Sequence, residues 1–267
     1  PWLLGQTDVP PFDDDVWELY DGRVDYSQTH DLAAEQPDRL RSLQRLWLIE
    51  AVKHDVIPLD DRTGERINPD LAGRPVLVRG GSQLFFPGMG RLSENSVVNI
   101  KNKSFSVTAE VEVPDGGADG VFIAQGGGFG GWSVYTGDGF LRFAYNVLGI
   151  HHYVTTSERR IPGGTHQLRM EFAYDGGGLG RGGDVTLYCD GDAVGAGRVD
   201  ATQPMIFSSD ETTDIGYESG TTVSADYDAR TSRFTGRIHW VQLDTGRDDN
   251  DHYIDPEERL RIAMAQQ

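Results

Sequence analysis

A strictly alternating run of ten residues constrains the fold of this chain more than any other feature. Residues 104–113 read SFSVTAEVEV, with an apolar side chain at every second position from Phe105 to Val113. A period of two is typical of a β-strand with one buried and one solvated face. Pro114 and Gly116 end the pattern. We therefore expect a strand whose water-facing side carries Ser104, Ser106, Thr108, Glu110 and Glu112.

Similar short segments recur through most of the chain after residue 70. Turn signals separate them and no helical pattern intervenes, which indicates a β-sandwich or a barrel. So many strands favour two packed sheets, and we predict a mainly β fold, a large antiparallel jelly-roll sandwich over residues 76–247. The other expected strands are 76–79, 83–86, 96–100, 121–125, 132–136, 139–147, 151–156, 166–174, 184–190, 193–198, 205–208, 213–217 and 233–243.

The first 58 residues follow a different pattern. Residues 16–20 (VWELY) predict a short strand, and Pro37 is placed to open a helix over 37–54. The spacing of Leu40, Leu43 and Trp47 gives that helix an apolar face. One strand and one amphipathic helix cannot bury themselves, so the segment 1–58 must dock on something else.

Two further segments complete the expected organisation. Residues 59–75 form a polar linker between the first segment and the sandwich. Residues 248–267 form a C-terminal tail, in which Pro256 opens a short helix that extends to Met264. The expected parts are therefore 1–58, 59–75, 76–247 and 248–267.

Composition excludes several classes of partner. The chain has 42 Asp and Glu against 24 Lys and Arg, a net charge of −18, which argues against a nucleic-acid partner. No apolar run approaches the ~18 residues of a membrane span.

The single cysteine, Cys189, excludes an internal disulfide and favours a reducing compartment. Its alternation with Val185 and Leu187 predicts a core position. The start at Pro1, without a signal peptide, suggests a piece of something longer.

The glycine-rich loops and the paired glutamates each admit a catalytic interpretation. The loops 126–131 and 176–183 lead into strands, whereas a phosphate-binding loop leads into a helix, so we predict hairpin turns. Glu110 and Glu112 share one strand face, as the carboxylates of a retaining glycosidase do at ~5 Å. The order of acids departs from Glu-x-Asp-x-x-Glu, and Pro114 lies inside the run, so a solvated strand face is the other interpretation.

Metal ligands were sought among the acidic turns and the histidines. Carboxylates in three turns could bind Ca²⁺ through oxygen, or serve only as turn residues: Asp175, Asp190, Asp192, Asp210, Glu211 and Asp214. His151 and His152 are adjacent in an expected strand and point to opposite faces. The remaining histidines show no zinc spacing: His30, His54, His166, His239 and His252. No catalytic, cofactor-binding or metal-ligating residue is predicted.

Several runs, taken in order, resemble the C-terminal part of a large bacterial arylsulfatase over about residues 15–243. The resemblance implies that the front segment ends the sulfatase α/β unit and that the sandwich is its concanavalin-like extension. The runs are 16–20, 25–28, 30–33, 56–62, 99–104, 119–127, 129–133, 172–178 and 234–238.

The same resemblance implies sulfate-ester hydrolysis by the parent enzyme. That family uses a formylglycine made within Cys-x-Pro-Ser-Arg or its serine form, with a Ca²⁺ or Mg²⁺ ion. Neither motif occurs here, and Cys189 is followed by Asp190, Gly191 and Asp192, so no family catalytic residue maps onto this chain. We expect an accessory scaffold that needs no cofactor itself, partners the catalytic N-terminal half, and lies in the bacterial cytoplasm; the oligomeric state stays open.

A non-catalytic glycan-binding module is the alternative. Trp132, Tyr135, Tyr145 and Tyr153 are the candidate sugar-stacking side chains, and core packing is the competing interpretation. The net charge disfavours polysulfated ligands without an intervening cation.

Overall fold

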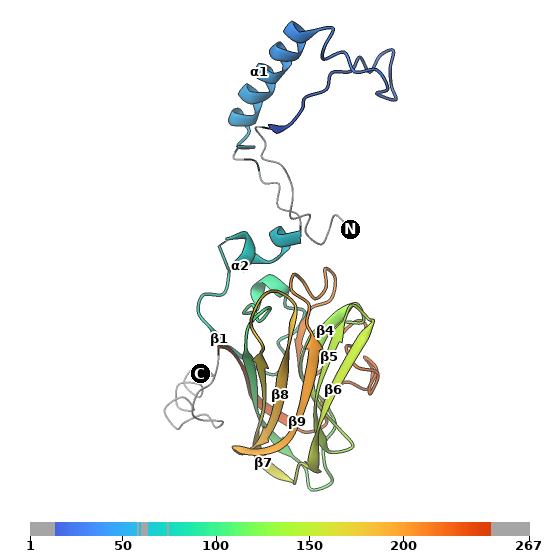
Figure 1. Ribbon diagram of the computed structural model, residues 1–267. Helices are drawn as coiled ribbons and strands as arrows, with labels where there is room; N and C mark the ends of the chain where they lie inside the picture. The colour runs from blue at the N-terminus through green and yellow to red at the C-terminus, as the bar shows by residue number, and fades with distance from the viewer. Residues whose placement is uncertain (1–13, 58, 60–63, 74, 247–267) are drawn as a thin grey trace. The chain divides into compact units, whose positions relative to one another are not determined.

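The computed structural model describes residues 14–57, 59, 64–73 and 75–246. The chain forms two compact units, with the boundary between Arg66 and Ile67. Figure 1 shows the helix α1 of the first unit in blue and the strands of the second unit in green to red.

The first unit contains the predicted helix, α1 (Pro37–Lys53), which begins at a proline as expected. Its packing is incomplete: Ala51 is its one buried residue. The edge of the Trp47 ring meets the Trp17 ring at 5.6 Å between centroids, which covers part of one side. The neighbouring Leu46, Leu48 and Ile49 remain exposed.

Residues 16–20 do not form the predicted strand; they have no regular secondary structure and no strand pairing. Two hydrogen bonds hold them: the Leu19 N–H donates to Asp31 Oδ1 at 2.9 Å, and the Leu32 N–H donates to Leu19 O at 2.7 Å. A strand needs a neighbouring strand to satisfy its backbone, and residues 16–20 have none among the residues that the structure describes.

The segment expected as a linker contains two short helical turns, η2 (Gly64–Ile67) and α2 (Pro69–Ala72). Asn68 stabilises the start of α2 as its N-cap, because the Asn68 side chain accepts the Asp70 N–H at 3.1 Å. Gly73, in the left-handed region at φ +65°, ends the helix.

The second unit is a sandwich of two antiparallel sheets, as predicted (Figure 1). A 3₁₀ turn, η3 (Glu94–Ser96), lies between β1 and β2. One sheet contains, in spatial order, β1 (Ser82–Phe85), β11 (Arg237–Thr245), β2 (Phe105–Val113), β7 (Gly164–Tyr174), β8 (Arg181–Cys189) and β9 (Asp192–Ala201). The other contains β10 (Thr213–Ile215), β3 (Gly120–Gly127), β4 (Gly130–Gly137), β5 (Phe140–Val147) and β6 (His151–Arg160).

The core lies between the sheets. The apolar face of β2 is buried as its alternation predicted, and Phe105 meets Trp132 of the opposite sheet at 5.6 Å between ring centroids. The glycine loops 126–131 and 176–183 are hairpin connections, also as predicted. No helix in the described part of the chain is long and apolar enough to cross a membrane.

Three predicted strands, 76–79, 96–100 and 205–208, are absent. Val97 and Val98 are both buried although they are adjacent, which a strand with one wet face does not allow. The Gln83 side chain serves their backbone: Oε1 accepts the Val98 N–H at 2.8 Å and Nε2 donates to Ser96 O at 3.0 Å. The predicted tail and its helix at 256–264 lie outside the described residues.

The polar face of β2 is only partly exposed to solvent, although the alternating sequence predicted that it would face water. Ser106 and Thr108 are buried, Glu110 is half-buried and Glu112 is exposed. Arg169 of the neighbouring strand β7 covers this face, donating to Thr108 Oγ1 at 2.7 Å. Long side chains on adjacent strands thus bury short polar ones between them.

Candidate functional site

A cleft of about 660 Å³ opens where β1 and β10, the edge strands of the two sheets, lie on the same side of the sandwich. The loop after β1, the end of β10 and the turn into β11 form it. We call it the basic cleft, because Arg233, Arg237 and His239 line it and none of its described lining residues is acidic. Its apolar lining includes Phe86, Ile215, Phe234 and Ile238.

A β-bulge at the start of β11 explains how His239 reaches this cleft. Ile238 lies opposite Val111 of β2 and Trp240 lies opposite Glu110, so His239 is the extra residue between them. In a regular strand Ile238 and Trp240 would share a face, but the bulge leaves Ile238 in the core and Trp240 in a separate cluster with Leu84 and Phe86.

The turn that carries Arg233 is fixed to the sandwich. The Phe234 ring packs edge-on against Phe122 at 4.9 Å between centroids. Gly120, at φ +124°, permits the approach, because a Cβ there would lie 2.4 Å from Phe234 Cα. Three backbone hydrogen bonds complete the attachment: Val121 N–H to Ser232 O, Phe234 N–H to Gly216 O and Thr235 N–H to Asp119 O.

Two of the basic side chains of the cleft are available to a ligand. Arg233 and Arg237 are exposed, and neither forms an ion pair within the described part of the chain. The Arg233 guanidinium lies over the Tyr217 ring at 5.2 Å, which orients it without neutralising it. A cleft of this kind attracts anions locally even though the whole chain carries a net charge of −18.

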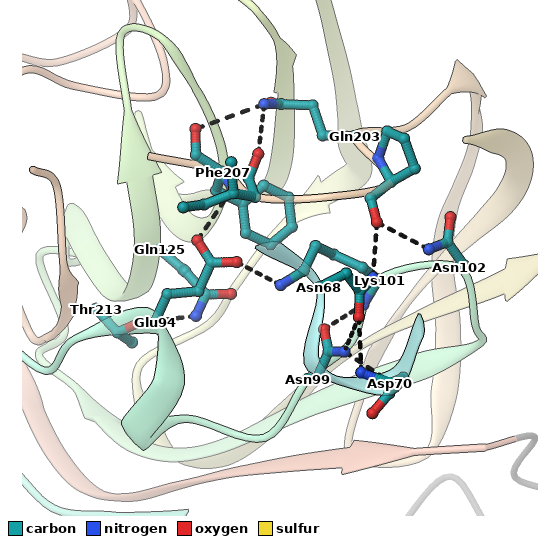
Figure 2. Close-up of polar contacts among 12 residues, drawn as sticks. Asn68, Asp70, Glu94, Asn99, Lys101, Asn102, Gln125, Gln203, Phe207 and Thr213 are labelled. Carbon is teal, nitrogen blue, oxygen red and sulfur yellow. Dashed lines mark hydrogen bonds and ion pairs between the residues drawn. The ribbon is translucent and has the colours of Figure 1, made fainter. Parts of the chain in front are cut away.

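A second cavity, of about 270 Å³, is lined by Glu94 and Lys101. Figure 2 shows the ion pair that these two side chains form. The Lys101 ammonium pairs with Glu94 Oε1, and the side chains are 3% and 14% exposed. Glu94 Oε2 also accepts the Phe207 N–H at 3.0 Å, and the Lys101 Nζ lies 5.1 Å from the centre of the Phe207 ring. The pair thereby joins the loop before β2 to the loop after β9.

Amide side chains extend this network, as Figure 2 shows. Asn99 Nδ2 donates to Asn68 Oδ1 at 3.1 Å and to Asp70 Oδ2 at 2.9 Å. Asn68 and Asn102 both donate to Pro204 O, at 2.8 and 2.9 Å. These contacts use most of the polar atoms near the second cavity to hold loops together, so the basic cleft is the better candidate for ligand binding.

A third polar cluster lies on the face of the five-stranded sheet that points away from the core, under the segment 216–232. Glu218 is 1% exposed; its carboxylate accepts the Tyr227 hydroxyl at 2.6 Å and the Val223 N–H at 2.8 Å. Burial, together with the charges of Glu211 and Asp214, raises the pKa of Glu218 to about 7. The Tyr227 hydroxyl oxygen also lies within hydrogen-bond distance of Ser133 Oγ of β4, at 2.7 Å, which ties the segment to the sheet.

The aromatic residues predicted to stack on sugars are packed inside the protein. Trp132, Tyr135 and Tyr145 are at most 3% exposed, and Tyr153 packs against the main core. Burial raises the pKa of the Tyr135 hydroxyl, which donates to Asp226 Oδ2 at 2.7 Å. None of the four lines the basic cleft.

The predicted acidic candidates are dispersed. Glu110 and Glu112 do not line the basic cleft. Asp214 accepts the Arg91 N–H and the Ser219 hydroxyl, both at 2.6 Å. Four other turn carboxylates are similarly engaged: Glu211 with Thr221, Asp175 with Arg198, Asp192 with Arg159, and Asp190 with His166. Asp210 is exposed. His151 and His152 are exposed on β6.

The residues of the basic cleft were missed by the sequence analysis. Arg237 was quoted only within the run 234–238, and His239 only as a histidine without a metal spacing. No local pattern marks a β-bulge or says that the loop after β1 approaches the turn into β11. The one available signal was two arginines close to Phe234 in a strongly acidic chain.

Comparisons with known proteins assign no family. No protein-family model matches the chain, and no curated protein matches it either. Solved structures with a similar arrangement include a SAP-like pentraxin from Limulus polyphemus, with 14% identity over 61% of this chain and 73% of that one, at a TM-score of 0.31. The CBM40 of a Ruminococcus gnavus IT-sialidase, bound to α2,3-sialyllactose, has 13% identity over 71% and 98%, at 0.41.

Domains LG4-5 of the mouse laminin α1 chain have 12% identity over 67% of this chain and 44% of that chain, at a TM-score of 0.35. Similarities of this strength do not place the chain in a family. The assignment to the β-sandwich class depends on its own two sheets.

Proposed function

We propose that this chain is the non-catalytic, C-terminal accessory part of an arylsulfatase-like sulfate-ester hydrolase. The ordered sequence runs support the family, and the packing of α1 supports the accessory role. The observation that carries the proposal is the run from Leu46 to Ile49, four apolar residues on consecutive positions of α1. Consecutive positions point to all sides of a helix, so this one turn of α1 has no polar side to turn toward water, as in a buried helix.

The first unit does not supply that burial. Trp17 covers part of one side of α1, while Leu46, Ile49 and Val52 stay exposed along another. Burying each such side chain contributes about 1.5–3 kcal/mol, enough to hold the unit on a partner. We propose, from the resemblance, that the partner is the catalytic α/β part of a sulfatase.

The purified chain is expected to hydrolyse no chromogenic aryl sulfate, with or without added Ca²⁺ or Mg²⁺, because it lacks the formylglycine motif. The measurement is release of the aryl group over time, with a complete arylsulfatase as the positive control. Turnover that disappears when the metal is chelated would contradict the non-catalytic role.

The basic cleft favours a second candidate, which is compatible with the first: the sandwich is a binding module for anionic glycans. Arg233 and Arg237 offer planar donors that suit sulfate or carboxylate groups, and Phe86 offers an apolar surface beside them. The sequence had argued against sulfated ligands from net charge alone; the local charge of the cleft supports the opposite inference.

Changing Arg237 or Arg233 to glutamine is expected to weaken binding of a sulfated glycan at least about tenfold each, since a charge-assisted hydrogen bond contributes about 1.5–3 kcal/mol. Calorimetric titration with chondroitin sulfate oligosaccharides, and with their desulfated forms, measures this. Arg159→Gln on β6 is the matched control and is expected to bind as the parent does. Weaker binding of the desulfated form would assign the recognised group as sulfate rather than carboxylate, whereas equal affinity in all variants would reject the cleft as the site.

A further inference from the structure

Three potential metal ligands meet at the end of the six-stranded sheet where β7 begins and β8 ends. They are His166, Cys189 and Asp190, and one ligand atom from each lies within 4.8 Å of the other two. Of the residues that the structure describes, no other three His, Cys, Asp or Glu side chains are grouped in this way. The sequence did not predict the group, because His166 and Asp190 are brought together by strand pairing rather than by spacing.

The backbone fixes the carboxylate of this group. Asp190 and Gly191 form the two-residue turn between β8 and β9, with φ of +53° and +87°, which is the geometry of a type I′ hairpin turn. The Asp190 N–H donates to Gln167 O, and the Gln167 N–H donates back to Asp190 Oδ1, both at 2.8 Å. Asp190 Oδ2 is thereby aimed at His166.

The ligand atoms are close enough to share one ion. His166 Nδ1 lies 2.7 Å from Asp190 Oδ2, and Cys189 Sγ lies 3.9 Å from the same oxygen. Ligands of a tetrahedral zinc ion are bound at about 2.0–2.3 Å, so the space between them needs only small side-chain adjustments to admit the ion.

The surroundings of the group match those of a metal site. His166 Nε2 lies 3.4 Å from Gly163 O, so that carbonyl can accept its N–H and leave Nδ1 as the ligand. Asp190 Oδ1 is engaged by Gln167, which leaves Oδ2 for the ion. Cys189 is buried, whereas the Asp190 side chain is 43% exposed, so water can reach the remaining coordination position.

We propose that His166 Nδ1, Cys189 Sγ and Asp190 Oδ2 form a three-ligand site for a divalent transition-metal cation of the zinc type. A thiolate, an imidazole and a carboxylate together suit Zn²⁺ or Co²⁺ and disfavour Ca²⁺ and Mg²⁺. Water completes the coordination. The site is separate from the basic cleft and does not depend on the sulfatase proposal.

The thiol must lose its proton to bind the ion. Binding of the cation then releases this proton to solvent, and the affinity is expected to fall as the pH is lowered.

Titration of the full chain with Co²⁺ tests the proposal, because a thiolate ligand produces a sulfur-to-cobalt charge-transfer absorption band. We expect one equivalent to generate that band, an excess of Zn²⁺ to abolish it, and Cys189→Ser to remove it. His166→Gln and Asp190→Asn are expected to weaken binding by at least about tenfold. His152→Gln, a change at an exposed histidine on β6, is expected to leave binding unchanged.

Asp190→Asn keeps the test valid if Cys189→Ser destabilises the core, because the amide oxygen can still accept the Gln167 N–H. Thermal unfolding confirms that each variant is folded before titration. Saturation with Co²⁺ without a charge-transfer band, or binding that is unchanged in His166→Gln and Asp190→Asn, would overturn the proposal.

Discussion

Replacing Lys101 by methionine is expected to lower the free energy of unfolding by about 3–5 kcal/mol. The ammonium is 3% exposed and is paired with Glu94, which also accepts the Phe207 N–H at 3.0 Å. Removing the cation leaves the Glu94 carboxylate buried and uncompensated in the centre of the network in Figure 2. Urea unfolding followed by fluorescence measures the loss.

Two further variants separate burial from charge. The double variant Lys101→Met with Glu94→Gln removes both charges and is expected to recover much of the lost stability. Lys103→Met breaks the more exposed pair with Asp70, whose side chains are 36% and 42% exposed, and is expected to lower stability by less than about 1 kcal/mol. Equal losses for Lys101→Met and Lys103→Met would show that the Lys101 pair does not act as a buried pair.

Glu218 is expected to make the sandwich less stable as the pH rises from about 4.5 to 7. Its pKa is raised from 4.5 to about 7 in the folded chain. Between these values the folded chain keeps a proton that the unfolded chain has lost, so the unfolded state binds fewer protons and stability falls with rising pH. The shift corresponds to a loss of stability on the order of 3 kcal/mol, and this loss is complete once the pH is above 7.

The measurement is the free energy of unfolding of the parent and of Glu218→Gln across that pH range, so that other titrating groups cancel in the difference. The parent is expected to lose stability relative to the variant as the pH rises. Glu158→Gln, at an exposed position of β6, is the matched control and is expected to follow the parent. A constant difference between the parent and Glu218→Gln would contradict the raised pKa.

Strands with strong alternation were predictable from the sequence, and those without it were not. Residues 104–113 became β2 because one face packs on the opposite sheet, as at the contact of Phe105 with Trp132. Residues 96–100 and 205–208 are loops that contain buried apolar side chains such as Val97, Val98 and Phe207, and the Gln83 side chain satisfies the backbone of Val98 in place of a neighbouring strand. Their composition resembles that of strands because burial selects the same residues.

The candidate sites depend on contacts between distant segments, which no local pattern encodes. Arg233 and Phe86 line one cleft although almost 150 positions separate them. His166 of β7 meets Asp190 because β7 pairs with β8, and Asp190 directly follows the last residue of β8. The aromatic residues considered for sugar binding pack in or against the core instead. Burying a large ring such as that of Trp132 stabilises the fold more than leaving it on the surface.

Mass spectrometry of the native protein tests the central proposal most directly. An antibody against the sandwich would be used to purify the protein from its source cells, and all peptides of the recovered polypeptide and its tight partners would be sequenced. The proposal predicts a peptide in which the cysteine or serine of Cys-x-Pro-Ser-Arg or Ser-x-Pro-Ser-Arg is converted to formylglycine, in the same polypeptide or in a stoichiometric partner. Recovery of the sandwich with complete peptide coverage and no such peptide would contradict it.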